Sequence, residues 1–332
     1  MDRMTPFTLA APRTVAEATA LLAATAGARA IAGGTDLLPN RRRGLDVAPL
    51  LVDLNAIPDL RVITLTSEGT TIGAGITLAR IAAEEQIRCT LPVLAEAAST
   101  VAGPGHRTVA TLGGNLCLDT RCIFYNQSEW WRHANAYCLK HGGDICHVAP
   151  QGKHCHAAFS GDLAPALLVL EADVEIAGPH GGRRVPLSDL YVDDGAAHLT
   201  LDVGEILVAV HIPAQPVSAR AGYRKARARG ALDFPLAGVA ARVSTRDGRL
   251  VGLRVALTGT NARPFLLEGT DELVGGPLGD PSLAMLAKLV RKQVGPMRTT
   301  VTHANYRRQV AAVLTQRLVR ELANGGDASG NP

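Results

Sequence analysis

Four of the six cysteines stand close together in the middle of the chain, where they could bind a metal centre. They are separated by 15, 7 and 8 residues and are Cys122, Cys138, Cys146 and Cys155. Thiolates suit both zinc and iron–sulfur clusters. The spacing matches neither the CxxCxxC pattern of ferredoxins nor the CxxC pairs of zinc sites, so the spacing alone leaves the metal open.

The segment around these cysteines differs in composition from the rest of the chain. Residues 122–159 hold six of the twelve aromatic residues and five of the ten histidines, and regular apolar periodicity is lost there. So long a loop is uncommon in a compact domain unless something orders it. We therefore interpret residues 117–160 as an insertion ordered by a four-cysteine centre, with an apolar wall of Trp130, Trp131, Phe124 and Tyr125.

Zinc, disulfides and inert thiols are the alternatives to an iron–sulfur cluster at these cysteines. Zinc stays open because His141, His147, His154 and His156 lie among them. Disulfides are disfavoured in a reducing compartment, and inert buried thiols need no ligand. We expect Cys89 to be structural and Cys117 to be a spare thiol.

Two glycine-rich turns, at residues 32–36 and 111–115, are candidates for binding an anion. Glycine lets backbone N–H groups converge on an anion, because no Cβ intervenes. Two such turns could hold the two phosphates of a pyrophosphate. Neither turn is GxGxxG or a Walker loop, which disfavours a Rossmann site.

The periodicity of apolar residues predicts the elements that must position these turns. The first turn follows a helix, with Thr14 as its N-cap, and a short strand. The second turn follows two strands and two helices, and the later of these helices begins near Pro92. The predicted ranges are 14–26, 28–32, 50–54, 61–65, 70–75, 78–87 and 91–102.

After the insertion, the pattern predicts a helix and strand from residue 162, a strand at 204–213, further strands, and two helices within 281–323. We place domains at 1–220, with subdomains of about 1–55 and 56–220, and at 221–325. The tail, 326–332, is expected to be disordered. The fold class is α/β (α+β).

Charge and hydropathy exclude several function classes. A net charge of +4 on 332 residues is too small to indicate nucleic-acid binding, and the one basic run, Arg41 to Arg43, suits a solvated loop or an anionic ligand. No apolar stretch reaches the length of a membrane span. The N-terminus lacks the apolar core of a secretion signal, so we expect a cytoplasmic protein.

The combination of motifs resembles the FAD-binding subunit or domain of the xanthine dehydrogenase and carbon monoxide dehydrogenase family. AGGTDLLP followed by TLGGNL carries the resemblance, with GDLAPALLVLEA, GEILVAVHIP and YRKARARGALDFPLAGVAA further on. The resemblance implies a two-subdomain FAD-binding domain of the PCMH or molybdenum-hydroxylase flavoprotein type, plus a C-terminal domain of antiparallel sheet with helices.

Positions that match the family's FAD contacts can be carried over by the resemblance. The first turn resembles a pyrophosphate loop, and the second turn its companion. An acidic contact, two apolar flavin-side positions and a lysine complete the set. The expected FAD contacts are Ile31, Ala32, Gly33, Gly34, Thr35, Asp36, Val101, Thr111, Leu112, Gly113, Gly114, Asn115, Asp162, Leu207 and Lys225. From the residues alone, Asp162 also suits a helix N-cap.

The insertion resembles that of the flavoprotein (beta) subunits of 4-hydroxybenzoyl-CoA reductases. The matching stretch is DTRCIFYNQSEWWR with the later YCLK, GDICHV and CHA. The resemblance implies a [4Fe-4S] cluster on Cys122, Cys138, Cys146 and Cys155, beside FAD.

The resemblance also implies partners, because the chain has no recognisable molybdopterin or [2Fe-2S] motif. A molybdopterin-containing large subunit and a [2Fe-2S] small subunit are expected to carry those cofactors. Electrons are expected to run inward from ferredoxin, and the substrate chemistry to take place on the large subunit.

Two functions of other classes remain as alternatives. A self-contained flavin oxidoreductase would need a base beside the flavin, for which His106 is the nearest candidate in sequence. A zinc-stabilised, non-redox interaction protein would contain neither flavin nor iron.

Overall fold

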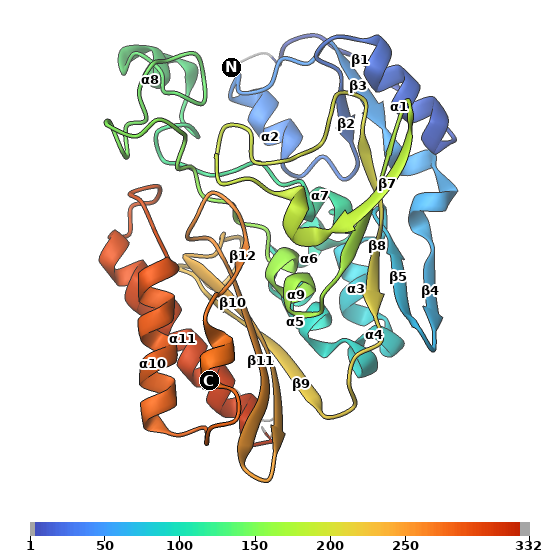
Figure 1. Ribbon diagram of the computed structural model, residues 1–332. Coiled ribbons are helices and arrows are strands. Elements are labelled where there is room, and N and C mark those ends of the chain that lie inside the picture. The colour runs from blue at the N-terminus through green and yellow to red at the C-terminus, as the bar shows by residue number, and fades with distance from the viewer. Residues whose placement is uncertain (1–3, 326–332) are drawn as a thin grey trace.

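A computed structural model describes residues 4–325 of the chain, so the predicted disordered tail lies outside the described residues. Figure 1 shows the N-terminal segment at one end, the C-terminal sheet and helices at the other, and the insertion as a lobe at the edge. None of the helices in the described range combines the length and apolar character needed to cross a membrane.

The N-terminal part is a small α/β unit around three parallel strands in the order β1-β3-β2. Thr14 caps α1 as predicted, because its side chain accepts a hydrogen bond from the Glu17 N–H at 3.2 Å. The elements are β1 (Thr8–Ala10), α1 (Val15–Ala24), β2 (Arg29–Ile31), α2 (Leu37–Arg42), β3 (Leu50–Asp53), η1 (Leu54–Ala56) and η2 (Pro58–Arg61).

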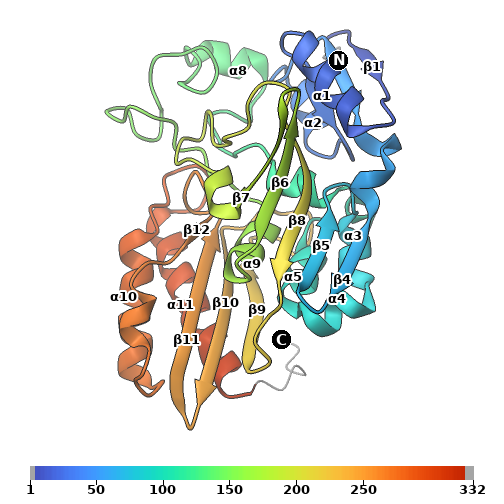
Figure 2. The same ribbon diagram turned by 45° about the vertical axis from the view of Figure 1, so that its right-hand side comes forward.

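The middle part is an antiparallel five-stranded sheet in the order β4-β5-β8-β6-β7 with helices beside it (Figure 2). Its strands are β4 (Ile63–Thr66), β5 (Gly69–Gly73), β6 (Asp173–Gly178), β7 (Gly181–Pro186) and β8 (Ile206–Pro213). Its helices are α3 (Leu78–Ala83), α4 (Glu85–Thr90), α5 (Pro92–Thr100), α6 (Pro104–Arg107), α7 (Leu112–Leu116), α8 (Glu129–Ala134), α9 (Leu163–Val169) and η3 (Leu187–Leu190).

The single helix predicted over 78–87 is wrong, because Glu84 is extended and divides it into α3 and α4. Ile81 and Ile87 are both fully buried. Six residues of one straight helix would place these side chains on different faces. The break turns both of them into the core.

The C-terminal part is an antiparallel sheet in the order β12-β11-β10-β9, with α10 and α11 on one face (Figure 2). Helix α9 packs on the same sheet, and all seven of its residues are buried, as expected of a helix that is apolar all round. The elements are β9 (Ala219–Ala226), β10 (Ala237–Arg246), β11 (Arg249–Thr258), β12 (Phe265–Leu266), η4 (Thr270–Leu273), α10 (Asp280–Gln293) and α11 (Ala304–Ala323).

Phe159 joins the end of the insertion to the C-terminal part. Its ring is fully buried and lies 5.2 Å from the Tyr191 ring. Its backbone N–H donates to the Asn261 carbonyl at 3.0 Å, and its carbonyl accepts from the Gly259 N–H at 2.8 Å. The end of the insertion and the C-terminal part of the chain therefore meet at Phe159.

Replacing Phe159 by Ala should lower the free energy of unfolding by about 3–5 kcal/mol, because it leaves a cavity where the two halves meet. Urea unfolding followed by circular dichroism measures the change. Val203→Ala, at a side chain that is 79% exposed, is the control and should change stability by less than about 0.5 kcal/mol. A Phe159→Ala protein as stable as the control would contradict this view of the junction.

Candidate functional site

The first glycine turn joins β2 to α2 and leaves backbone donors free. Gly34 adopts φ +67°, which only glycine reaches at little cost. The N–H groups of Gly33, Gly34 and Thr35 make no hydrogen bond to any residue in the described range 4–325. Free, closely spaced backbone N–H groups are what an anion such as a phosphate needs. The turn therefore fits the predicted pyrophosphate loop.

The second glycine segment is not an open turn, because it forms the start of α7. The Leu112 and Gly113 N–H groups donate to the Ile76 and Ala74 carbonyls at 2.9 and 2.8 Å. The Gly114 N–H donates to the Thr111 side chain at 3.1 Å. These three backbone donors are thus already engaged within the chain, unlike those of the first turn. Contact of residues 111–115 with FAD stays a prediction.

The first glycine turn lies against the residues directly before the second segment. A Cβ on Gly33 would be 2.2 Å from the Val109 carbonyl oxygen, so only glycine permits this approach. A Cβ on Gly113 would be 2.9 Å from the Ala74 Cβ and 3.5 Å from a Leu207 methyl group. Leu207, on β8, therefore lies beside the second segment, and its contact with a flavin stays a prediction.

Asp162 occupies the N-cap position of α9 but does not cap the helix with its side chain. The Asn115 side chain takes that role and accepts from the Leu163 N–H at 3.0 Å. The Asp162 carboxylate pairs instead with the Lys225 ammonium at 2.9 Å and accepts from the Tyr223 hydroxyl at 2.6 Å. Burial raises the pKa of Asp162, and the charge of Lys225 opposes that rise.

Lys225 connects this cluster to Val101, the remaining predicted FAD position. Its ammonium also donates to the Thr100 carbonyl at 3.3 Å, directly before the half-buried Val101. The predicted FAD positions therefore form one continuous set, from the first turn through α7 and Asp162 to Lys225.

Tyr223 belongs to this cluster although no sequence motif singled it out. It is 2% exposed, and a Cβ on Gly238 would lie 2.3 Å from its hydroxyl, so Gly238 makes room for it. Strand alternation is the sequence signal that could have found Tyr223, because residues two apart on β9 share a face. Tyr223 and Lys225 are such a pair.

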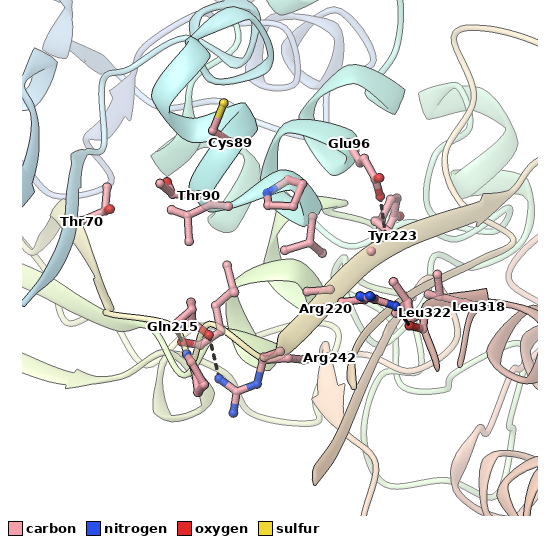
Figure 3. Close-up of a pocket in the computed structure, with 18 of the residues that line it drawn as sticks. Thr70, Cys89, Thr90, Glu96, Gln215, Arg220, Tyr223, Arg242, Leu318 and Leu322 are labelled. Carbon is pink, nitrogen blue, oxygen red and sulfur yellow. Dashed lines mark hydrogen bonds between the residues drawn. The ribbon is translucent and has the colours of Figure 1, made fainter. Parts of the chain in front are cut away.

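A groove of about 1330 Å³ lies on another side of Lys225, between α5, β9 and the end of α11 (Figure 3). Figure 3 shows Glu96 bonded to the Tyr223 backbone and Arg242 to Gln215, at 2.8 and 2.7 Å. None of the described residues that line this groove belongs to either glycine segment. The expected site is therefore defined by the glycine segments and not by this larger hollow.

Two single-residue expectations change with the structure. Cys89 is exposed and lines the groove, so it is not a structural core residue. Arg41 is 1% exposed and pairs with Asp46 at 2.6 Å, so the basic run is not simply a solvated loop.

Two further residues were singled out in the sequence. His106 is exposed on α6. Cys117 follows α7, and burial raises the pKa of its thiol to about 12, which suits a spare, unreactive thiol.

The four predicted metal ligands converge, as the insertion's composition indicated. All four thiols are buried and free, and they line one small cavity. Within residues 4–325, no three or more His, Cys, Asp or Glu side chains lie close enough together to hold a metal ion. Burial raises the pKa of Cys122 to about 11 and of Cys155 to about 12, so a metal centre must displace their protons.

The aromatic wall is present only in part. Phe124 and Tyr125 line the cavity, and Trp131 packs on Phe124 with ring centres 6.0 Å apart. Trp130 is 77% exposed, so its predicted place in the wall is wrong. Trp130 and Trp131 are successive residues of α8, about 100° apart around the helix, and cannot both face the cavity.

The two ends of the insertion pair with each other, and α8 contacts the end of α2. Arg121 and Ala158 exchange two backbone hydrogen bonds of 2.8 Å and close the loop. The buried Arg132 of α8 donates to the Arg43 carbonyl at 2.9 Å, which holds the lobe beside α2 (Figure 1).

A short segment links the cysteine cavity to the first glycine turn. The Asp119 N–H donates to the Asp36 carboxylate at 3.2 Å, and Arg121 forms an ion pair with that carboxylate. Cys122 follows Arg121 directly, and Lys140 reaches back from the cavity to Asp119 at 2.6 Å. The two candidate sites are therefore neighbours in space.

Comparison with known proteins decides the family. The FAD binding domain in molybdopterin dehydrogenase matches residues 5–215, and the CO dehydrogenase flavoprotein C-terminal domain matches residues 221–322. The chain belongs to this family of FAD-binding oxidoreductase subunits. Its fold is accordingly the family's FAD-binding domain followed by the C-terminal sheet domain.

Similar proteins span nearly the whole chain. The xanthine dehydrogenase FAD-binding subunit of Escherichia coli O157:H7 is 29% identical over 94% of this chain and 95% of its own. The aldehyde oxidoreductase FAD-binding subunit of E. coli K12 is 33% identical over 81% and 86%. A solved CO dehydrogenase from Oligotropha carboxidovorans has a TM-score of 0.79 at 26% identity, covering 97% of this chain and 99% of that one.

Gly33→Ala should lower FAD affinity by roughly tenfold or more, because the added Cβ pushes the first turn away from Val109. The measurement is FAD titration of the flavin-depleted protein, with circular dichroism to verify folding. Gly105→Ala is the matched control, since a Cβ there meets nothing within 4 Å. Unchanged affinity in a folded Gly33→Ala protein would contradict the role of this close approach.

His198 should make stability depend on pH. It is buried, its ring bonds the Leu118 carbonyl at 2.9 Å, and burial lowers its pKa to about 4. The unfolded imidazole titrates near 6.5, so the unfolded state gains a proton first as pH falls through this window. We expect about 2 kcal/mol of stability to be lost between pH 7 and pH 5 through this residue.

Urea unfolding of wild type and His198→Gln at both pH values checks this contribution. Glutamine can keep a donor for the Leu118 carbonyl but does not titrate. The loss of stability should be smaller in the variant, and an equal loss in both proteins would rule out His198 as its source.

Proposed function

We propose that this chain is the FAD- and [4Fe-4S]-containing electron-transfer subunit of a molybdenum enzyme of the 4-hydroxybenzoyl-CoA reductase type. The observation that carries the proposal is the convergence of four buried thiols on one cavity next to the first glycine turn. The overall reaction would be ferredoxin-driven reductive dehydroxylation of an aromatic acyl-CoA. The chain itself would relay electrons, and a partner would bind the substrate.

The FAD would be held by residues with distinct tasks. The free N–H groups of Gly33, Gly34 and Thr35 suit a pyrophosphate, and Leu207 offers an apolar surface to an aromatic ring. Lys225, fixed by Asp162, would bring a positive charge to the ring, which raises the potential of a flavin. When bound, FAD supplies a carrier of electrons, and the chain supplies position and charge.

The cluster would be held by Cys122, Cys138, Cys146 and Cys155. Four thiolates on one zinc ion at about 2.3 Å each would lie within about 4 Å of one another. The four thiols line one small cavity, a ligand set that suits a [4Fe-4S] cluster as well as zinc, and metal analysis distinguishes the two. The apolar side chains of Phe124 and Val148 in the lining would help set its potential.

The partners follow from the same proposal. The chain carries the FAD domain of the family and spans nearly the full length of relatives that are themselves named as subunits. We propose a molybdopterin-containing large subunit, a [2Fe-2S] small subunit and ferredoxin as the electron donor.

Two alternatives lead to different measurements. A flavin subunit acting with another aromatic or heterocyclic substrate would share every feature described above except the substrate of its partner. A zinc-stabilised, non-redox protein would contain zinc and no iron or flavin. Metal and flavin analysis separates the second alternative, and activity of the assembled complex with different acyl-CoA substrates separates the first.

Anaerobically purified protein should contain about four iron and four sulfide per chain, with one FAD. Cys138→Ser and Cys146→Ser should each abolish the iron and leave most of the flavin, because the two sites are held by different residues. Cys89→Ser, at an exposed thiol outside the cavity, is the control and should retain both. FAD without iron in the wild type, or zinc in its place, would refute the cluster.

A further inference from the structure

We propose that Lys140 is a built-in cation that raises the reduction potential of the centre bound by the four cysteines. The inference rests on the proposed cluster and extends it from the ligands to a charge beside them. Neither the spacing of the cysteines nor the comparisons point to this lysine.

Lys140 lies in the wall of the cysteine cavity. Its side chain is only 5% exposed. Among the described residues that line the cavity, it is the only one with a permanent charge, and the others are thiols, apolar or aromatic side chains and His147. Lysine is almost never buried unless it is paired, and Lys140 is paired with Asp119 at 2.6 Å.

The ammonium is held by oxygen atoms behind the cavity and not by the thiols. It donates to the Asp119 carboxylate at 2.6 Å and to the Thr120 hydroxyl and carbonyl at 2.5 and 3.2 Å. It also lies 4.3 Å from the centre of the Tyr125 ring. These contacts use the three donors of an ammonium, so Lys140 acts on the cavity through its charge and not through a hydrogen bond to sulfur.

The direction of the effect follows from electrostatics. One-electron reduction adds one negative charge to a cluster, and a nearby cation stabilises the more negative, reduced form. Because the site is buried, water screens this interaction weakly. Lys140 therefore raises the potential, and Asp119 behind it offsets part of that effect. Asp119 does not line the cavity, so the lysine is the nearer charge.

The same charged pair also borders the expected flavin site. The Asp119 backbone N–H bonds to Asp36 in the first glycine turn. A change of Lys140 is thus expected to act most strongly on the cluster, with a smaller effect on a group bound at the turn.

The test uses full-length, anaerobically purified protein with its cofactors. Lys140→Met keeps the length of the side chain and removes the charge, Lys140→Arg keeps the charge, and Lys153→Met is a matched control at an exposed lysine of the same insertion. Iron and sulfide are counted first. The midpoint potential of the cluster is then measured by stepwise reduction with dithionite, followed by electron paramagnetic resonance.

Lys140→Met should retain iron and shift the reduction equilibrium at least tenfold toward the oxidised form, which is about 59 mV for one electron. Lys140→Arg and Lys153→Met should stay within about twofold of wild type, or about 18 mV. Asp119→Asn should move the potential in the opposite direction, because it removes the negative charge that offsets the lysine.

An iron-containing Lys140→Met protein with the wild-type potential, or an equal shift in Lys153→Met, would overturn the inference and leave the proposed cluster intact. If Lys140→Met loses its iron, Asp119→Asn decides: a higher potential supports the inference and an unchanged one overturns it. A wild-type chain without iron would instead refute the proposed function itself, and the inference with it.

Discussion

The buried ion pair between Asp162 and Lys225 is the interaction on which the arrangement of this protein depends. Helix α9 is apolar on all sides, so it lies in the core and carries Asp162 with it. A buried carboxylate needs a charged partner, because an unpaired one costs about 3–5 kcal/mol. Lys225 from β9 is that partner, and the pair therefore joins the middle part of the chain to the C-terminal sheet. Tyr223 and the space left by Gly238 complete the carboxylate's surroundings.

A second constraint is the contact between the cysteine insertion and the first glycine turn. The segment from Asp119 to Cys122 makes this contact, because it bonds to Asp36 at one end and supplies a cavity thiol at the other. The lobe that carries the four cysteines lies at the edge of the molecule, beside the N-terminal part (Figure 1).

Particular residues show where sequence reasoning reached its limit. The alternation and periodicity of apolar residues correctly indicated most strands and helices, and the capping role of Thr14 was visible from its position. The engagement of the α7 backbone donors was not visible, since a sequence does not reveal that Ala74 and Ile76 accept hydrogen bonds from Leu112 and Gly113. The capping of α9 was misjudged, because the side chain of Asn115 comes from 48 residues away.

Local patterns along the chain were enough to indicate the class of fold and the family, and they singled out candidate groups for chemistry. A linear chain displays such patterns and motifs directly. The pairing of Asp162 with Lys225, the exposure of Trp130 and the place of Lys140 beside the cysteine cavity came only from the folded chain. Such facts depend on which distant segments pack together, because burial forces each charge to find a partner from whatever the fold brings near it.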